Sequence, residues 1–528
     1  MLKAFFIFLF VVQSILGSFQ VNAQQNRFLV FFTDKQGSEF NPLTYFDRKA
    51  IERRIKTGVS LYDSSDYPVS EIYIRKITNY VEQINGKTRW FNAVSVTASD
   101  EQINKLLGFQ FVRSVQPIVL STEPAGKIFD STLTASEKEL LELQTSLMQA
   151  KLFADKGYTG KGIRIAIFDA GFPSVDKSPV FEHLRKNKQI VKTWDFARKK
   201  EKVYANNVHG TMVLSCIAGI ANGKNIGLAP DAEFLLARTE VTTEPFSEEE
   251  NWLQAMEWAD KNGADIINSS LAYTYHRYNT FEMDGHTSLV AKAANMAAFK
   301  GILVVNAMGN DGAHDWKILA TPADADSVLS VGAINPYTEF HAAYSSFGPT
   351  SALNMKPNVV AAGTVIAAAK SKLKQVKGTS FAAPLVAGFA ACAWQSREFL
   401  TNMQIFNMIE ESAKLYPYFD YAHGYGVPQA SYFVNGKGFA DVEQTFEFVQ
   451  NGNQLIVKVK KEFIETKNLK LNNYLYYHIK SVNGTIEKYY LIDVYQQKAV
   501  IVQLDELKGA KEIMVHFKGF SNSFKLIP

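Results

Sequence analysis

Cysteine and an excess of charge of either sign are both lacking in this chain. The 528 residues include 2 cysteines, which excludes a disulfide-rich scaffold and any zinc or iron–sulfur site built from several thiolates. The 56 basic and 52 acidic residues leave a formal net charge of +4, too balanced for an electrostatic nucleic-acid binder, so no nucleic-acid partner is expected. Cys216 and Cys392 lie in apolar, helix-like segments, and we favour two buried thiols, although a disulfide cannot be decided from sequence.

Long hydrophobic runs are also lacking, apart from one at the N-terminus. Lys3 precedes an apolar stretch that reaches about Gly17, and small residues follow before position 24, which is typical of a signal peptide over residues 1–23. A membrane anchor is the alternative, but Gln13 and Ser14 interrupt the stretch, and a spanning helix needs about 20 apolar residues. We therefore expect a protein exported by its signal peptide, with no transmembrane segment after cleavage, that is secreted, periplasmic or at the cell surface.

The remaining sequence predicts several globular domains. Hydrophobic residues make up 47% of the chain, and its length exceeds the roughly 100–200 residues of one compact domain. Residues 24–121 mix strand-like and amphipathic segments, which predicts a small α+β domain, and residues 122–154 form a polar connector with a helix. Residues 155–435 alternate short Val/Ile/Leu-rich runs with helical stretches, which predicts an α/β domain whose parallel sheet carries helices on both faces. Strand-like runs separated by glycine turns predict an all-β, sandwich-like module over residues 436–528.

Three segments of the α/β region carry an acid, a base and a nucleophile. Asp169 ends a buried strand, His209 opens a helix of small residues, and Ser380 begins another such helix. A serine hydroxyl is a poor nucleophile until an imidazole accepts its proton, and the imidazole needs a carboxylate to fix its tautomer. Taken alone, each residue could be a turn former, a loop residue or a helix cap. Their joint occurrence in the order Asp, His, Ser instead predicts a catalytic triad, in the chain order of subtilisin.

A fourth segment predicts an oxyanion-binding group. ILVVNAMGNDG reads as a buried strand that ends in a Gly-Asn-Asp-Gly turn, and the amide of Asn310 in this turn is expected to stabilise the developing oxyanion. The free backbone N–H groups at the start of the helix that carries Ser380 suit the same charge.

These segments resemble the subtilisin-like serine proteases (subtilases), of the secreted bacterial type with an N-terminal inhibitory propeptide. GKGIRIAIFDAGF is similar to the family's Asp segment, VHGTMVLSCIAG to its His segment and GTSFAAPLVAG to its Ser segment, and the resemblance covers about residues 155–432. It implies a subtilisin-like sheet in which Asp169 orients His209, His209 acts as general base and acid, Ser380 attacks, and Asn310 steadies the oxyanion. It also implies that residues 24–121 are the propeptide, which would inhibit its own enzyme in a zymogen.

The resemblance further implies a substrate site. ADIINSSLA resembles the strand that pairs with the substrate backbone, so Ser269, Ser270, Leu271 and Ala272 are expected to bind substrate, together with Gly309.

Two departures from the family pattern, Ala272 and Ala170, and two neighbouring side chains affect this site. Ala272 stands where the family usually has glycine, and together with Ala320 it favours small P1 side chains. Met308 is expected to add bulk on the opposite wall. Ala170 stands where a serine or threonine is usual, so a hydroxyl next to Asp169 is missing.

The expected activity is thus a secreted serine-type endopeptidase that acts on protein or peptide substrates without a cofactor. No metal ligands are assigned; subtilases often bind structural calcium, but no loop here has the spacing to locate a site. Glu248–Glu250 are interpreted as a solvated helix start. The tyrosines at 476–477 and 489–490 are interpreted as packing pairs rather than a carbohydrate-binding face. Two alternatives remain, a non-catalytic binding protein that kept the fold and a dedicated processing protease with one partner.

Overall fold

The computed structural model describes residues 26–118, 134–241, 246–274, 277–370, 372–436, 442–464, 473–495, 499–507 and 509–526. The chain folds into two compact units. Residues 26–39 and 67–118 build the first unit, whereas residues 40–66 belong to the second unit together with the described residues from 134 onward. The expected signal peptide at residues 1–23 and residues 122–133 of the expected connector lie outside the described residues.

The first unit is a four-stranded antiparallel sheet with two helices. The strand order is β2-β3-β1-β4. Alternate side chains of the central strands, such as Val30 and Val96, pack against the buried faces of the helices through Ile77 and Leu106. Ser99 begins the second helix with a reciprocal capping box. The predicted α+β fold is therefore confirmed, and its elements are β1 (Asn26–Phe32), α4 (Glu71–Thr78), β2 (Gln83–Thr88), β3 (Ala93–Ala98), α5 (Asp100–Leu107) and β4 (Val112–Ile118).

Residues 40–66 form two short helices within the second unit. The helices are α2 (Pro42–Tyr45) and α3 (Arg48–Thr57). Asp47 caps α3 by accepting a hydrogen bond from the Lys49 N–H, and Gly58, with φ of +72°, ends it. The amphipathic segment at residues 41–56 therefore forms two helices, which the N-cap at Asp47 separates.

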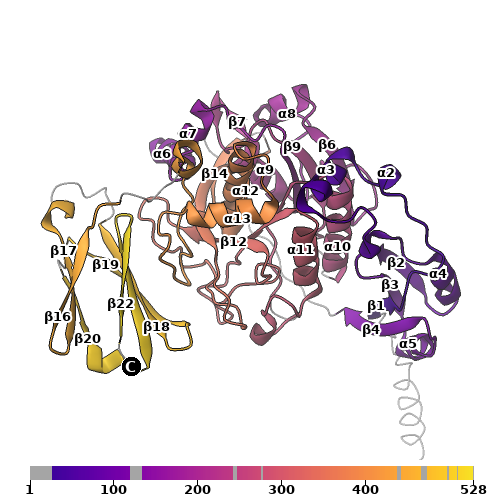
Figure 1. Ribbon diagram of the computed structural model, residues 1–528. Helices are drawn as coiled ribbons and strands as arrows, with labels where there is room; N and C mark the ends of the chain where they lie inside the picture. Colours follow the sequence, from indigo (N-terminus) through magenta and orange to yellow (C-terminus); the bar gives the residue numbers. More distant parts are fainter. Residues whose placement is uncertain are drawn as a thin grey trace, which may run out of the picture. The chain divides into compact units, whose positions relative to one another are not determined.

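A seven-stranded sheet forms the centre of the second unit (Figure 1). Its order is β13-β12-β11-β10-β5-β9-β6, and every neighbouring pair is parallel. The predicted runs coincide with five of these strands, whereas the edge strand β6 carries Lys192 and Thr193 and so lacks a continuous apolar run. The strands are β5 (Arg164–Asp169), β6 (Ile190–Asp195), β9 (Glu233–Arg238), β10 (Ile266–Ser269), β11 (Leu303–Ala307), β12 (Val328–Ile334) and β13 (Val359–Ala362).

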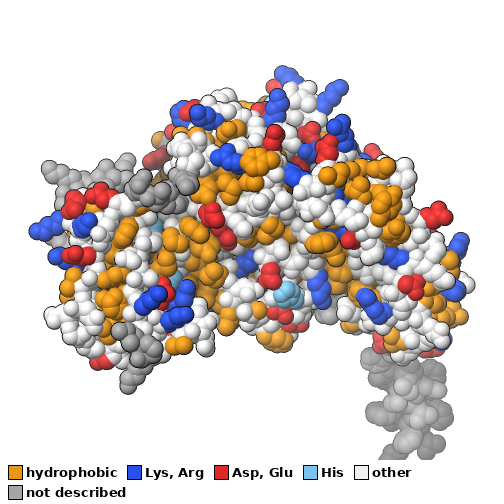
Figure 2. Space-filling view, viewed as in Figure 1, with side chains coloured by type: hydrophobic (Ala, Val, Ile, Leu, Met, Phe, Trp, Pro, Cys, Tyr) orange, Lys and Arg blue, Asp and Glu red, His pale blue; other side chains and the backbone are white. Residues whose placement is uncertain are grey.

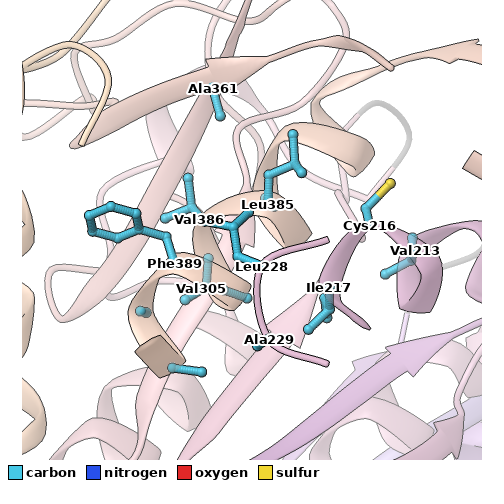
Figure 3. Packing of buried hydrophobic residues seen from close by; sticks show 14 of the residues in the cluster. Val213, Cys216, Ile217, Leu228, Ala229, Val305, Ala361, Leu385, Val386 and Phe389 are labelled. Atoms are coloured by element: carbon cyan, nitrogen blue, oxygen red, sulfur yellow. The ribbon is translucent and has the colours of Figure 1, made fainter. Parts of the chain in front are cut away.

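Helices cover both faces of this sheet, as predicted for an α/β fold. Ile165 and Ile167 of β5 belong to the large core shared with helices α9 and α12, whereas Phe168 points the other way and meets Trp252 of helix α10 edge-to-face at 6.0 Å. Figure 3 shows the first face, where Leu385 and Val386 pack among side chains from several strands and helices. The helices are α6 (Ala135–Ser146), α7 (Ala150–Asp155), α8 (Glu182–Lys186), α9 (His209–Ala218), α10 (Phe246–Lys261), α11 (Leu289–Phe299), α12 (Thr379–Gln395), α13 (Asn402–Glu411) and α14 (Ala430–Asn435).

The chain ends in an all-β module, as predicted. Two sheets, ordered β16-β17-β20 and β19-β18-β21-β22, share one apolar core. Tyr477 stacks on its cross-strand partner Tyr490 at 4.7 Å, and Tyr476 is also buried, which confirms the packing interpretation of these tyrosines. The strands are β16 (Phe446–Asn451), β17 (Gln454–Val459), β18 (Tyr474–Ser481), β19 (Ile486–Asp493), β20 (Ala499–Gln503), β21 (Ala510–Phe517) and β22 (Phe520–Lys525). Two further antiparallel pairs lie outside the module: β7 (Ile220–Ala221) with β8 (Lys224–Asn225), and β14 (Thr364–Ala369) with β15 (Lys372–Lys377).

The surface charge is mixed, as the balanced composition indicates, and both cysteines are free. Basic and acidic side chains are interspersed on the face seen in Figure 2, with no large area of one sign. Cys216 and Cys392 are both free and wholly buried, which confirms the prediction of two thiols. Among the residues that the structure describes, none of the helices combines the length and apolar character needed to cross a bilayer.

Candidate active site

The predicted catalytic side chains meet at one edge of the central sheet. After β5 the chain builds β6 and β9 on one side, and β10 to β13 on the other, so the strand order reverses next to β5. In open parallel sheets, ligands bind at the carboxyl ends of the strands where this reversal occurs. Asp169 is the last residue of β5, Ser269 is the last residue of β10, and Asn310 follows β11.

Asp169 and His209 form a hydrogen-bonded pair. The His209 Nδ1 atom lies 3.0 Å from each carboxylate oxygen of Asp169, which is wholly buried, while 26% of the His209 side chain is exposed. The backbone N–H of Ala170 also donates to Asp169 Oδ1, at 2.7 Å. The carboxylate thus keeps Nδ1 protonated and turns Nε2 into the free acceptor. Ala170 lacks a hydroxyl but still donates its backbone N–H to the acid.

A glycine allows this close approach. His209 is the first residue of α9, and a side chain on Gly210 would place its Cβ 2.5 Å from the Gly171 carbonyl oxygen and 2.9 Å from Asp169 Cβ. The Asp-Ala-Gly turn and the His-Gly helix start therefore pack directly against each other.

A second carboxyl group acts on His209. Glu240, two residues beyond β9, is partly buried; burial, followed by the charges of Asp169 and Glu248, raises the pKa of its carboxyl to about 8. Burial of the His209 imidazole favours its neutral form, but the Asp169 carboxylate outweighs this and, together with Glu240, raises the pKa of His209 to about 9. The sequence analysis missed Glu240; its only local signal is its position directly after the buried run that ends at Thr239.

Ser380 lies in the first turn of α12. Its hydroxyl donates to the Ser270 carbonyl at 3.3 Å, and the Ser270 hydroxyl donates to the Ser380 carbonyl at 2.9 Å. The next residue, Phe381, packs its ring 5.4 Å from the His209 ring, so the histidine adjoins this helix start. Within the described part of the chain, the hydrogen-bond partner of the Ser380 hydroxyl is Ser270 rather than His209. Catalytic hydrogen bonds are often unformed without substrate.

Asn310 lies against the same helix start. Its Oδ1 accepts hydrogen bonds from the Thr379 backbone N–H at 2.9 Å and from the Thr379 hydroxyl at 3.0 Å. The amide oxygen is thereby fixed, and Nδ2 keeps its two protons for another acceptor. Gly309, with φ of +110°, makes this turn, and a Cβ there would lie 2.8 Å from Ser346 Oγ.

Buried polar side chains brace the expected substrate strand. Trp252 Nε1 donates to Ser269 Oγ at 3.1 Å, and Asn306 Nδ2 donates to the Leu271 carbonyl at 3.0 Å. The side chains of residues 269–271 are buried, whereas Ala272 is exposed. The strand is therefore held rigidly up to the residue that faces solvent.

The residues expected around the P1 pocket are close to one another. Ala320 is wholly buried, and a Cβ on Gly309 would lie 3.5 Å from its methyl group. Met308 is also wholly buried and packs with Leu319 and Ala323.

The interpretation of Glu248–Glu250 as a solvated helix start is wrong in one respect. Glu248 and Glu249 do lie in the first turn of α10, but their side chains are only 16% and 14% exposed. Arg277 bonds to both carboxylates at 3.1 Å. No local pattern reveals this contact, because Arg277 comes back to the helix start only in the folded chain. Within the described ranges, no three His, Cys, Asp or Glu side chains gather as ligands for a metal ion, so we assign no calcium site.

Comparison with known families identifies the protein's class. Residues 160–426 match the subtilase family of S8 peptidases, and residues 27–128 match the Peptidase S8 propeptide domain of Bacteroidota. The chain therefore belongs to the subtilase family, whose members are serine endopeptidases, and it carries a propeptide domain.

The chain is also similar to individual proteases. The chain is 26% identical over 346 residues to alkaline elastase YaB of Bacillus sp. (strain YaB), covering 64% of this chain and 83% of the relative. It is 28% identical over 271 residues to subtilisin Savinase of Lederbergia lenta, covering 51% of this chain and 89% of the relative. It is also 30% identical over 289 residues to the minor extracellular protease Vpr of Bacillus subtilis (strain 168), covering 51% and 32%. Among solved structures, MycP1 from the ESX-1 type VII secretion system matches with a TM-score of 0.45 and 22% identity, over 57% of this chain and 88% of that chain.

Proposed function

We propose that this chain is an exported serine endopeptidase, made as an autoinhibited zymogen, that hydrolyses peptide bonds through an acyl-enzyme on Ser380. The observation that carries the proposal is the Asp169–His209 pair, held at 3.0 Å beside the helix start that contains Ser380 and adjoins Asn310. A decayed enzyme that kept only the fold would have no reason to retain all four groups in one place.

In the acylation step, Ser380 Oγ forms a bond to the scissile carbonyl carbon while its proton passes to His209 Nε2. Asp169 stabilises the imidazolium that results. The C–N bond then breaks as His209 returns the proton to the leaving amine. A water molecule repeats the sequence on the ester and releases Ser380.

The oxyanion that forms in both steps needs donors placed in advance. The N–H of Ser380 lies in the first turn of α12, where helix N–H groups lack an intrahelical acceptor. The Asn310 amide, fixed through its oxygen by Thr379, supplies the second donor.

Substrate binding would activate the nucleophile by competition. An extended peptide that adds alongside residues 269–272 would direct a backbone N–H to the Ser270 carbonyl. That carbonyl is the acceptor of the Ser380 hydroxyl at rest. Once the substrate occupies it, the hydroxyl is released towards His209 Nε2.

The zymogen and export parts of the proposal depend on the N-terminal sequence. The match to an S8 propeptide domain supports an intramolecular inhibitor that precedes the catalytic domain. The charged residue and apolar stretch at the start of the chain support export by a signal peptide.

A fluorophosphonate tests the nucleophile directly. The matured wild-type protein should be labelled on Ser380, and its N-terminus, read by mass spectrometry, should lie beyond the propeptide. Ser380→Ala should take no label and stay unprocessed. Folded, processed wild-type protein that takes no label would overturn the protease assignment and favour the non-catalytic binding protein.

A panel of peptides distinguishes a broad endopeptidase from a dedicated processing enzyme. Turnover of many unrelated sequences supports the broad activity. Label uptake with cleavage of no panel member would point to a single dedicated substrate.

A further inference from the structure

Glu240 is a carboxyl group beside His209 that the proposed mechanism does not use. It lies two residues beyond β9, and the N–H of the preceding Thr239 donates to the Asp169 carbonyl at 3.0 Å. The backbone thus places Glu240 at the end of β5, where its charge helps to raise the pKa of His209. Among the residues that the structure describes, none forms a hydrogen bond or an ion pair with the Glu240 carboxylate.

The charges around Glu240 leave its carboxylate without a countercharge. Arg277 forms ion pairs with Glu248 and Glu249, both at 3.1 Å, so two carboxylates already share its single positive charge. Burial raises the pKa of Glu240, the charges of Asp169 and Glu248 raise it further, and Arg277 opposes them only in part. This region of the sheet edge therefore carries an excess of negative charge, which favours the binding of a cation.

A buried hydroxyl in the same region also lacks a partner. Tyr273 directly follows the expected substrate residues 269–272 and is 5% exposed, and its hydroxyl makes no hydrogen bond within the described part of the chain. The Arg277 guanidinium lies 4.6 Å from the centre of its ring. Burial raises the pKa of Tyr273, and the charges of Glu248 and Glu240 add to the rise. The hydroxyl oxygen can accept a hydrogen bond from a cationic ligand group, which would satisfy it.

The order of the strands decides which substrate side chain meets Glu240. The expected substrate strand continues β10, which has β11 on one side and β5 and then β9 on the other. Gly309 and Ala320, at the expected P1 pocket, follow β11, whereas Glu240 follows β9. Successive side chains of an extended peptide point in opposite directions. When the P1 side chain enters the pocket beyond β11, the side chain of the preceding residue, P2, therefore turns towards His209 and Glu240.

We propose that Glu240 is a specificity-determining residue that selects substrates with Lys or Arg at P2. The proposal rests on the proposed function and narrows its substrate class to peptides with a cation one position before the residue whose carbonyl is attacked. The cation pairs with the Glu240 carboxylate close to the Tyr273 hydroxyl, and it favours the ionised form of the carboxyl. Once paired, Glu240 no longer stabilises the His209 imidazolium, so the same substrate favours the histidine in its basic form.

Two peptides that differ only in the P2 ammonium test the proposal. One carries Lys at P2 and the other carries norleucine, whose side chain has the same carbon atoms without the charge. Matured wild-type protein, assayed above the Glu240 pKa of about 8, should cleave the Lys peptide with a kcat/KM about tenfold higher or more, as expected for one hydrogen bond between charged groups. The absence of a preference for the Lys peptide would overturn the proposal.

A matched pair of variants assigns the preference to Glu240. Glu240→Gln should bring the ratio of the two kcat/KM values close to one, whereas Glu182→Gln, which breaks the exposed Glu182–Lys186 pair, should keep the wild-type ratio. A role of Glu240 confined to His209 would change both kcat/KM values alike and leave the ratio as it is. An unchanged ratio in Glu240→Gln would therefore overturn the proposal.

The pH dependence of the ratio decides the case if Glu240→Gln does not fold. In wild-type protein the preference for the Lys peptide should fall as the pH drops below about 8, because Glu240 becomes protonated there. A preference that is independent of pH would overturn the proposal. Wild-type protein that takes no fluorophosphonate label would count against the proposed function. Labelled protein that cleaves neither peptide, or both equally, would overturn the role of Glu240 alone.

Discussion

Ser270 and Ser380 each donate a side-chain hydrogen bond to the other's backbone carbonyl, at 2.9 Å and 3.3 Å. The Ser380 carbonyl can accept this bond because the residue four positions on in α12 is Pro384, which has no N–H to donate. Pro384 thus allows Ser380, the expected nucleophile, to bond to Ser270 in the expected substrate strand.

This linkage predicts a rescue between two positions. Ser270→Ala should lower kcat/KM about tenfold or more, because it leaves the Ser380 carbonyl unsatisfied at a cost of about 1–3 kcal/mol. Adding Pro384→Ala restores a backbone N–H for that carbonyl and should recover part of the loss. A double-mutant cycle in kcat/KM and in melting temperature measures the coupling. A double variant no better than Ser270→Ala would contradict the explanation.

The pH dependence of cleavage should report His209. The imidazole acts as a base only when neutral, so kcat/KM should rise with pH through the His209 pKa of about 9. Glu240 has a pKa of about 8 and is therefore ionised in that range, where its charge favours the imidazolium. Glu240→Gln should then move the rising limb to lower pH. Glu182→Gln, on the exposed start of α8, should not move it. A shift to higher pH in Glu240→Gln would contradict the role of its charge.

Asn310 should contribute to the transition state rather than to substrate binding. Asn310→Leu should lower kcat by about 10²–10³, the loss known for the oxyanion-hole asparagine of subtilisin, with little change in KM. Thr379→Val removes one of the two bonds that hold Asn310 Oδ1 and should cost less. Steady-state kinetics on one peptide substrate gives both values. A rise in KM at constant kcat would assign Asn310 to binding instead.

The width of the P1 pocket should depend on one methyl group. Ala272 is exposed at the end of the expected substrate strand, and its Cβ is expected to narrow the pocket. Ala272→Gly should raise kcat/KM for peptides with P1 Phe relative to P1 Ala, by about 10-fold or more if the methyl is the obstacle. Unchanged selectivity would remove Ala272 from the list of specificity residues.

Acid should weaken the contact between the terminal β module and the preceding chain. His516 of β21 packs near Tyr418, and burial lowers the pKa of His516 to about 3. An unfolded histidine has a pKa near 6.5, so the unfolded state binds the proton more readily. The stabilising effect of a neutral His516 is complete above pH 6.5 and is lost as the pH falls towards 3. His516→Asn should therefore flatten the fall in the free energy of unfolding between these pH values, measured by denaturant titration; an unchanged slope would contradict this.

Sequence could locate the expected triad because each member sits in a local pattern. Asp169 ends an apolar strand, and His209 and Ser380 each begin a helix of small residues, so the fold alone brings them to one edge of the sheet. Glu240 and Arg277 could not be found in this way. Glu240 acts on His209, 31 positions before it, and Arg277 bonds to carboxylates 28 and 29 positions before it, so no local sequence pattern connects either residue with its partner.

The burial of α3 likewise could not be predicted from the local sequence. Its arginines look like a solvated face, yet Arg53 and Arg54 are 2% and 0% exposed. Their acid, Asp260, lies more than 200 positions further along the chain. Two strands of the terminal module, β16 and β22, were not predicted because at least half of the positions in FEFVQN and FSNSFK are polar.

The buried ion pairs between residues 40–66 and the catalytic part constrain how the two can change during evolution. Arg54 and Asp66 lie before the region where maturation is expected to cut, and Asp260 and Lys300 lie after it; Arg54 forms a buried ion pair with Asp260, and Asp66 forms one with Lys300. Related enzymes should therefore gain or lose these four residues together. A chimaera that joins this catalytic domain to the pro-region of a relative without them should fold poorly until Asp260 and Lys300 are also exchanged.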